Sequence, residues 1–307
     1  MSTWLPSAPC TPTACGARVP AAAALPRALL RLAALAAVLV VGIALSPLAA
    51  RCAPGRRARL VRLWCRALLH AVGVRLRVDG DLTSRPGRAG SEGCSGVTGE
   101  GGGQAGGSGR NTTEGRAGVL VVANHISWLD IPVLAAVRPA RMLAKSEVRT
   151  WPVAGRLAVR GRTLFIDRSR PRALPGTVAG IAAALRDGAA VAAFPEGSTW
   201  CGRDRGPFRR AVFQAALDAH VPVQPVGIAY ALGCKAPSTT PAFVGDDTLI
   251  ASVWRVAAAR GLVARVRIPA ALDVGDHPDR RSLARAAQDA VDGAPSAYRR
   301  GGCGAPQ

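Results

Sequence analysis

The chain has 307 residues, of which 49% are hydrophobic, so it can bury a sizeable core and wholesale disorder is excluded. Forty basic residues against nineteen acidic ones give a net charge of +21, and only Lys145 and Lys235 among the basic ones are lysines. This charge favours anionic partners, but aromatic residues make up only 4% of the chain, too few for the stacking that single-stranded nucleic-acid binding needs.

The first predicted element is an uncharged apolar stretch from Leu32 to Ala50, which follows a segment, residues 1–27, that is expected to be flexible. The stretch predicts a membrane segment, and Pro47 is expected to end its helix near Ala44 to Ser46. This leaves fewer than the ~20 residues of a straightforward span. The segment is therefore expected either to cross the membrane with help from its flanks or to enter one leaflet as half of a helical hairpin.

A cleaved signal peptide is the main alternative for this stretch, because basic residues precede a short apolar core and small residues follow it. Arginines are more frequent after the stretch than before it. They stand at positions 18, 27 and 31 before it, and at 51, 56, 57, 59, 62 and 66 after it. This excess predicts that the C-terminal bulk of the chain lies on the cytoplasmic side of the cell membrane.

Residues 56–72 repeat apolar side chains at helical spacing, while most arginines fall elsewhere on the wheel. This pattern predicts a basic amphipathic helix, either lying on anionic lipid or packed as an ordinary surface helix. Its place directly after the apolar stretch favours lipid. Residues 28–72 are therefore predicted to form membrane-anchoring helices.

Alternating residues predict that 73–85 hold the first strand of the catalytic domain. Residues 86–117 are rich in glycine and predict a disordered insert. The segment GGGQAG at 101–106 matches the dinucleotide-binding pattern only formally, because no strand precedes it and no helix follows.

The stretch GVLVVAN (118–124) predicts a buried parallel strand, and HISWLDIPVLAAV predicts the start of a helix beyond its carboxyl end, where α/β sheets place their ligands. Residues five apart in a helix lie about 140° apart, so His125 and Asp130 meet only if His125 lies at the mouth of the helix. Asp130 would then accept the Nδ1 proton and leave Nε2 as a free base. On its own, such a pair is better explained as a capping or core hydrogen bond.

Three further blocks change this interpretation. NHISWLD (124–130) is followed by GRTLFIDR (161–168), FPEGST (194–199) and VPVQPV (221–226). In this order and spacing the four blocks resemble those of the glycerolipid acyltransferases that carry the N-H-x4-D motif, and the similarity is greatest to bacterial 1-acylglycerol-3-phosphate acyltransferases. The resemblance covers roughly residues 55–270.

Between the blocks, residues 171–194 predict a helix, an Asp-Gly turn and a strand. The expected fold is α/β, with a mixed, largely parallel sheet flanked by helices and preceded by an N-terminal membrane helix or helical hairpin. The acyltransferase catalytic domain is expected over residues 118–270. Residues 271–307 are expected to hold a C-terminal helix, near 279–292, and a frayed tail.

The resemblance implies that His125 is the general base and that Asp130 orients it. The acceptor hydroxyl can attack a thioester directly, so no enzyme nucleophile is required. The resemblance also implies a phosphate-binding role for Arg168, with an ion pair to Asp167 or Glu196 as the alternative.

Three further substrate-binding residues are implied by the same resemblance. Lys145 matches a basic residue that the family carries between its first two blocks. Glu196 and Gly197 are implied to shape the acceptor site. Because a carboxylate repels phosphate, Glu196 is expected to bind a glycerol hydroxyl or to orient Arg168.

The expected activity is transfer of a fatty acyl group from acyl-CoA or acyl carrier protein to 1-acylglycerol 3-phosphate (lysophosphatidic acid), giving phosphatidic acid at an anionic phospholipid membrane. No metal, organic cofactor or nucleic acid is expected. Two alternatives remain: another lysolipid acceptor such as lyso-ornithine lipid, or a basic nucleic-acid-binding or non-catalytic lipid-binding protein. The eight cysteines are scattered, with no C-x-x-C and no metal-like clustering with histidine, so they predict no functional site.

Overall fold

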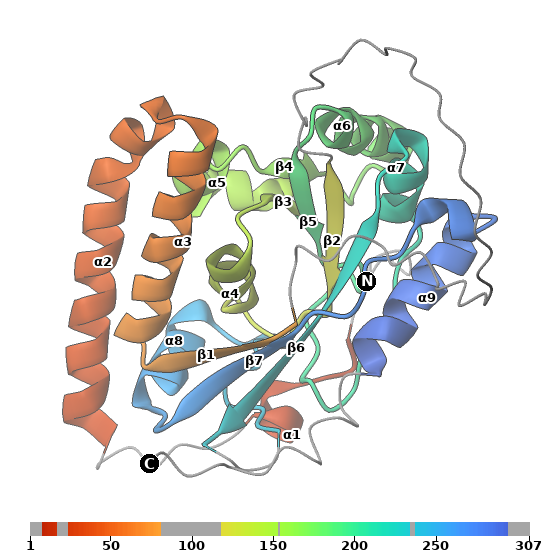
Figure 1. The fold of residues 1–307 in the computed structure, drawn as a ribbon. Coiled ribbons are helices and arrows are strands. Elements are labelled where there is room, and N and C mark those ends of the chain that lie inside the picture. The colour runs from red at the N-terminus through yellow and green to blue at the C-terminus, as the bar shows by residue number, and fades with distance from the viewer. Residues whose placement is uncertain (1–7, 17–23, 81–117, 153, 234–236, 294–307) are drawn as a thin grey trace, which may run out of the picture.

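The computed structural model describes residues 8–16, 24–80, 118–152, 154–233 and 237–293. The predicted insert at 86–117 lies outside them. Helices and strands alternate along much of the described chain (Figure 1). The helices are α1 (Pro12–Cys15), α2 (Leu25–Arg51), α3 (Pro54–Ala71), α4 (Asp130–Val137), α5 (Ala154–Arg160), α6 (Leu174–Arg186), α7 (Ala211–Ala219), α8 (Leu249–Ala258) and α9 (Arg280–Asp292). The strands are β1 (Val74–Asp79), β2 (Val119–Ala123), β3 (Arg141–Lys145), β4 (Leu164–Ile166), β5 (Ala190–Ala193), β6 (Val223–Leu232) and β7 (Leu262–Arg267).

The strands form one seven-stranded sheet in the order β1-β7-β6-β2-β5-β3-β4. Neighbouring strands are parallel except β6 and β7, which pair antiparallel. The predicted α/β class with a mixed, largely parallel sheet is therefore confirmed. β2 lies at the centre and all five of its residues are buried, as a strand covered on both faces requires.

Side chains that alternate along β2 enter two separate cores. Val119, Val121 and Ala123 face the core beneath α3, α4 and α8, whereas Leu120 and Val122 face the core beneath α6, α7 and α9. Figure 1 shows these two groups of helices on opposite sides of the sheet. The two-residue period of a strand thus builds both cores from one short segment.

The expectation that Pro47 ends the apolar helix is wrong. α2 continues through Pro47 to Arg51. Proline cannot donate to the carbonyl four residues earlier, here that of Ile43. That carbonyl instead accepts hydrogen bonds from the Ser46 hydroxyl at 2.7 Å and from Arg160 of α5 at 3.4 Å. Because the freed carbonyl keeps partners, the helix does not break.

The expectation of a flexible segment over residues 1–27 is wrong for residues 8–16, and also for residues 24–27, where α2 begins. Thr11 caps the short helix α1, accepting a hydrogen bond from the Ala14 amide at 3.2 Å. Cys10 is 4% exposed and belongs to the core beneath α4. Burial of Cys10 therefore fixes residues 8–16 against the sheet domain, although no periodic pattern in this stretch predicts structure.

Antiparallel helices α2 and α3 lie side by side along one flank of the domain (Figure 1). The indole Nε1 of Trp64 donates to the Val38 carbonyl at 3.0 Å and ties the two helices together. The first turns of α2 also bind the end of α8, where Arg27 donates to the Ala258 carbonyl at 2.9 Å. The two N-terminal helices are therefore a hairpin integrated with the sheet domain.

Candidate active site

The predicted site residues follow four parallel strands that end at the same edge of the sheet. His125 follows β2, Glu196 and Gly197 follow β5, Lys145 ends β3, and Arg168 follows β4. In α/β sheets this carboxyl edge is where ligands bind. Their order across the sheet is β2, β5, β3, β4, so His125 lies at one side of the group and Arg168 at the other.

Asn124 fixes the end of β2. Its Nδ2 donates to the Ile228 carbonyl at 2.9 Å, and its Oδ1 accepts from the Ile228 amide at 2.8 Å. The side chain is 1% exposed. Its amide group pairs with the N–H and C=O of Ile228 in β6, as the backbone of a neighbouring strand would. The chain therefore leaves the sheet at a fixed point immediately before His125.

His125 Nδ1 lies 2.8 Å from Oδ2 of Asp130, which is the first residue of α4. The predicted geometry is confirmed, since His125 lies in the turn before the helix and Asp130 reaches back to it. The same oxygen accepts from the amides of Ile126 at 2.6 Å and Ser127 at 2.8 Å. Asp130 is fully buried while the His125 side chain is 20% exposed. An ionised Asp130 fixes the proton on Nδ1 and leaves Nε2 as the basic nitrogen.

Tyr230 completes the set of donors around Asp130. Its hydroxyl donates to Oδ1 at 2.6 Å from β6. Burial, followed by the charge of Asp130 and the hydrogen bond to it, raises the pKa of Tyr230 well above its ordinary value. The phenol therefore stays protonated and keeps donating. Both carboxylate oxygens of Asp130 are thus engaged, which fixes its rotamer.

His125 is held by one stacking contact to its ring and by two hydrogen bonds to its backbone. The Phe194 ring stacks on it with centroids 4.0 Å apart and planes 12° from parallel. The His125 carbonyl accepts from the Trp200 amide at 2.8 Å, and its amide donates to Oε2 of Glu196 at 2.6 Å. A face-stacked aromatic ring also stabilises a positive charge on the imidazole.

Glu196 lies at the expected sheet edge but is buried among backbone amides. It is 3% exposed, and its second oxygen accepts from the Gly206 amide at 3.2 Å. Burial raises the pKa of Glu196 to about 8, although the amides of His125 and Gly206 and the charge of Arg205 oppose the rise. Its two oxygens accept from backbone amides that shape the loop of His125, and its expected role towards a glycerol hydroxyl or Arg168 stays a prediction.

Arg168 donates to the Gly197 carbonyl, reaching from β4 past β3 to the end of β5. Burial lowers the pKa of Arg168, the charge of Glu147 opposes this, and the charge of Arg209 adds to it. Arg168 pairs with neither carboxylate named in the alternative: Asp167 lies 3.5 Å from Arg170, and the oxygens of Glu196 accept from backbone amides. Arg168 therefore places a partly desolvated positive charge beside the turn Pro195-Glu196-Gly197, here called the PEG turn.

Gly197 and Lys145 shape the same edge in different ways. Gly197 has φ 75°, a left-handed conformation that glycine adopts without strain. Its amide donates to the Phe194 carbonyl at 3.1 Å, which closes the turn that exposes its carbonyl to Arg168. Lys145 is exposed at the end of β3, the strand between β5 and β4. A second positive charge is thus available at the edge where Arg168 lies.

Comparison with known proteins shows the family of the chain. A family model described as Acyltransferase matches residues 108–229. The 1-acyl-sn-glycerol-3-phosphate acyltransferase of Neisseria meningitidis is 35% identical over 175 residues, which are 57% of this chain and 68% of that protein. The lyso-ornithine lipid O-acyltransferase of Pseudomonas aeruginosa is 34% identical over 238 residues, 76% of this chain and 78% of its own.

The chain belongs to the acyltransferase family. Its fold also matches the crystal structure of the 1-acyl-sn-glycerophosphate acyltransferase from Thermotoga maritima, with a TM-score of 0.63 over 92% of this chain and 98% of that one. The two sequences are 15% identical, so this likeness concerns the fold.

The candidate site contains contacts that the sequence did not predict. Tyr230 lies in β6 on the same face as Val226 and Ile228. Two-residue alternation along β6, together with the parallel pairing of β6 and β2, could have indicated that Tyr230 faces the core beneath α4, the helix that begins at Asp130. Phe194 directly precedes the PEG turn but carries no ionisable group that would mark it. Tyr230 in β6 contacts Asp130 and Phe194, just after β5, stacks on His125, so both act on the pair from segments that are distant in sequence.

Proposed function

We propose that this acyltransferase moves a fatty acyl group from the thioester of acyl-CoA or acyl carrier protein to the free hydroxyl of 1-acylglycerol 3-phosphate, giving phosphatidic acid. The observation that carries the proposal is the 2.8 Å contact between His125 Nδ1 and a buried Asp130 carboxylate. It supports a histidine base at the sheet edge, where Arg168 also lies. The curated relatives include 1-acyl-sn-glycerol-3-phosphate acyltransferases.

The proposed reaction needs one proton acceptor. Nε2 of His125 takes the proton of the acceptor hydroxyl while its oxygen attacks the thioester carbonyl carbon. The carbonyl oxygen becomes an oxyanion in the tetrahedral intermediate. When that intermediate collapses, the C–S bond breaks and the leaving thiolate takes the proton from Nε2, which regenerates His125. Asp130 remains ionised and stabilises the imidazolium that forms between the two steps.

Arg168 supports a phosphate-bearing acceptor. A guanidinium presents several N–H donors in a plane and can hold a phosphate through two hydrogen bonds. Burial of Arg168 strengthens such contacts because less water competes for them. In this proposal Arg168 and the exposed Lys145 bind the phosphate of the acceptor while its glycerol hydroxyl faces His125. The reaction itself requires neither a metal nor an organic cofactor.

Lyso-ornithine lipid is the second candidate acceptor. The relative that acts on it in Pseudomonas aeruginosa aligns with 76% of this chain, compared with 57% for the Neisseria meningitidis relative at similar identity. The longer match includes sequence outside the four blocks. An acceptor without phosphate would not depend on Arg168 in the same way, so the two candidates make different predictions for that residue.

We infer that α2 is a membrane anchor. It is the one described helix long and apolar enough to cross a bilayer, and only 6% of its most apolar window is buried against protein. Its uncovered apolar side chains include Leu30, Val40 and Leu48. If α2 were a signal peptide, its cleavage would remove the contacts of Arg27 and Arg31 with the end of α8. These contacts therefore favour retention of the helix.

The contacts of α2 support embedding in one leaflet over crossing. Arg31 near its start binds carbonyls at the end of α8, and Ser46 near its end contacts Arg160 of α5. These points are ~22 Å apart along the helix axis, less than the ~30 Å of the hydrocarbon core. Both belong to one sheet domain, which we place on the cytoplasmic face from the arginine excess after α2.

The test is acyl transfer by the purified full-length protein in anionic vesicles. 1-Acylglycerol 3-phosphate, other lysophospholipids and lyso-ornithine lipid are each offered with palmitoyl-CoA and with palmitoyl carrier protein, and products are identified by mass. We expect phosphatidic acid to form at least about tenfold faster than any other product. Faster acylation of lyso-ornithine lipid would select the second candidate, and the absence of any acylated product would refute the enzymatic proposal.

A further inference from the structure

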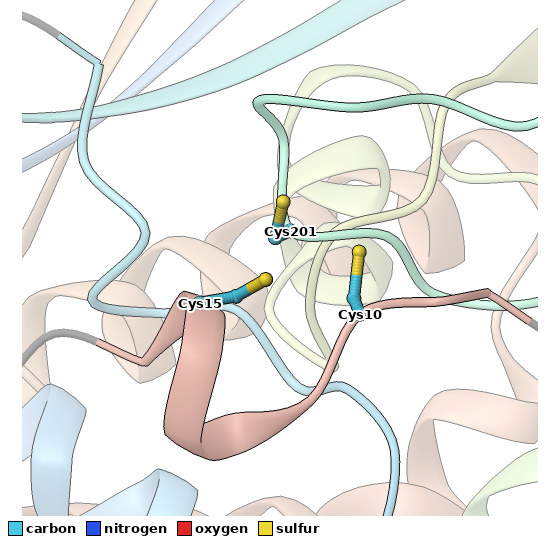
Figure 2. A group of neighbouring side chains, drawn as sticks. All are labelled: Cys10, Cys15 and Cys201. Atoms are coloured by element: carbon cyan, nitrogen blue, oxygen red, sulfur yellow. The ribbon is translucent and has the colours of Figure 1, made fainter.

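Three cysteines from two distant segments meet beside the active-site loop. Cys10 precedes α1 and Cys15 is the last residue of that helix, and Cys201 lies in the loop after β5 (Figure 2). Their sulfur atoms all lie within 4.8 Å of one another. Cys10 and Cys201 are buried, Cys15 is half-buried, and all three are free thiols.

Local structure on each side presents these thiols to a common point. The Thr11 cap and the hydrogen bond from the Cys15 amide to the Thr11 carbonyl, 2.9 Å, fold the segment into one helical turn. Cys10 and Cys15 are thereby brought to the same side of the segment. On the other side, Gly202 has φ 87°, and the tight turn it permits directs the chain back immediately after Cys201.

The thiols of Cys10 and Cys201 differ in how readily they ionise. Burial raises the pKa of Cys10 to about 12. Burial acts in the same direction on Cys201, but hydrogen bonds from the amides of Asp204 and Arg203 and from the other two thiols outweigh it and lower the pKa of Cys201. A bound cation favours thiolate ligands over thiols.

We propose that Cys10, Cys15 and Cys201 together bind one thiophilic metal ion, with Zn²⁺ as the expected ion. Tetrahedral zinc with Zn–S bonds of ~2.3 Å places its sulfurs about 3.8 Å apart, so sulfurs within 4.8 Å of one another need to approach by at most ~1 Å. Thiolate ligands select Zn²⁺ over the harder cations Mg²⁺ and Ca²⁺. The half-buried side at Cys15 leaves the fourth coordination position to a water molecule.

A metal at this point would connect the N-terminal segment to the active site. Cys201 directly follows Trp200, whose amide donates to the His125 carbonyl. Thr199 of the same loop donates to the Phe243 carbonyl. The ion would cross-link residues 10–15 to the loop that holds the base. Its role would be structural, and it would take no part in the acyl transfer itself.

The test is the zinc content of the full-length protein purified under reducing conditions. We expect about one zinc ion per chain in the wild type, and at least about a tenfold lower content in Cys201→Ser and Cys15→Ser. Cys52→Ser is the matched control, because Cys52 is also a half-buried free thiol but lies at the end of α2. It is expected to retain the wild-type zinc content.

A second measurement does not depend on the folding of any variant. Wild-type protein freed of zinc and titrated with Co²⁺ is expected to develop the near-ultraviolet thiolate-to-cobalt charge-transfer band, which added Zn²⁺ abolishes. The proposal is overturned if the wild type carries less than about a tenth of a zinc ion per chain and shows no such band. It is also overturned if alkylation and peptide mass spectrometry find a disulfide among the three cysteines, since the cluster would then be a redox pair.

Discussion

The Tyr230 hydroxyl donates a 2.6 Å hydrogen bond to Oδ1 of Asp130, and the other oxygen of Asp130 is hydrogen-bonded to Nδ1 of His125. The two residues come from β6 and α4 and are both buried. Because the second carboxylate oxygen is occupied, Asp130 cannot rotate away from the imidazole without breaking a buried hydrogen bond. The histidine is therefore oriented by a pair of residues.

Tyr230→Phe tests this arrangement. The substitution leaves a buried carboxylate oxygen without its donor, which costs roughly 1–3 kcal/mol in the free energy of unfolding. Since the contact between His125 and Asp130 remains, kcat should fall by no more than about tenfold. Chemical denaturation and steady-state kinetics measure the two effects. A loss of kcat as large as that of an Asp130 variant would assign Tyr230 a direct role in the chemistry.

Asp130→Asn separates charge from shape. Asparagine keeps the volume and can still accept from the amides of Ile126 and Ser127, but it cannot stabilise the imidazolium by charge. We expect kcat to fall by at least about a hundredfold, with KM for both substrates changed by less than about threefold. A wild-type kcat would mean that Asp130 serves only to cap the turn before α4.

Arg168→Ala discriminates between acceptors. Loss of a charge-assisted contact with phosphate should raise KM for 1-acylglycerol 3-phosphate by roughly 10- to 100-fold, while Arg168→Lys should be intermediate because lysine cannot bind in a fork. Arg170→Ala is the matched control, since the Arg170 side chain is 79% exposed. Equal losses with a phosphate-free acceptor would show that Arg168 acts through the Gly197 turn instead.

Glu196 predicts a pH dependence of stability. Folding raises its pKa from 4.5 to about 8, so between these values the folded chain binds more protons than the unfolded chain. Its contribution to the free energy of unfolding should therefore fall as pH rises through this window. Urea unfolding of Glu196→Gln should lack that slope, while Asp218→Asn, which alters an exposed carboxylate, should keep it. Identical slopes in the wild type and in Glu196→Gln would contradict the prediction.

Arg31 joins the anchor to the sheet domain. Its Nη1 donates to the Ala257 and Ala259 carbonyls at 2.9 and 2.5 Å, which caps the end of α8. Arg31→Ala should lower the free energy of unfolding by roughly 1.5–3 kcal/mol. Arg56→Ala, which changes an exposed arginine of α3, should have less than about 0.5 kcal/mol of effect. If the two variants unfold alike in detergent, α2 is not coupled to the domain.

Local and topological features of this chain were predictable. The geometry of His125 and Asp130 follows from their spacing and the helical repeat, and the gathering of Lys145, Arg168 and Glu196 follows from parallel strands that end at one edge. Their roles in substrate binding remain proposals. The buried position of Glu196 was missed, because a motif gives order along the chain but not which backbone amides surround a side chain.

Other features depend on contacts that no local pattern records. The rule that proline ends a helix fails at Pro47, because Ser46 and Arg160 supply partners for the freed Ile43 carbonyl. The meeting of Cys10 with Cys201 depends on docking of an aperiodic segment against a distant loop. In both cases the deciding partner lies in another element, so spacing and hydropathy carry no sign of it.

The central claim is that His125 is the base of acyl transfer, and the most direct measurement is the rate at which His125→Ala forms phosphatidic acid from 1-acylglycerol 3-phosphate. The variant should bind vesicles as the wild type does and lose 10²- to 10⁴-fold in kcat, about the contribution of a general base. His70→Ala, which alters an exposed histidine of α3, should retain full activity. Turnover by His125→Ala within tenfold of the wild-type rate would contradict the mechanism.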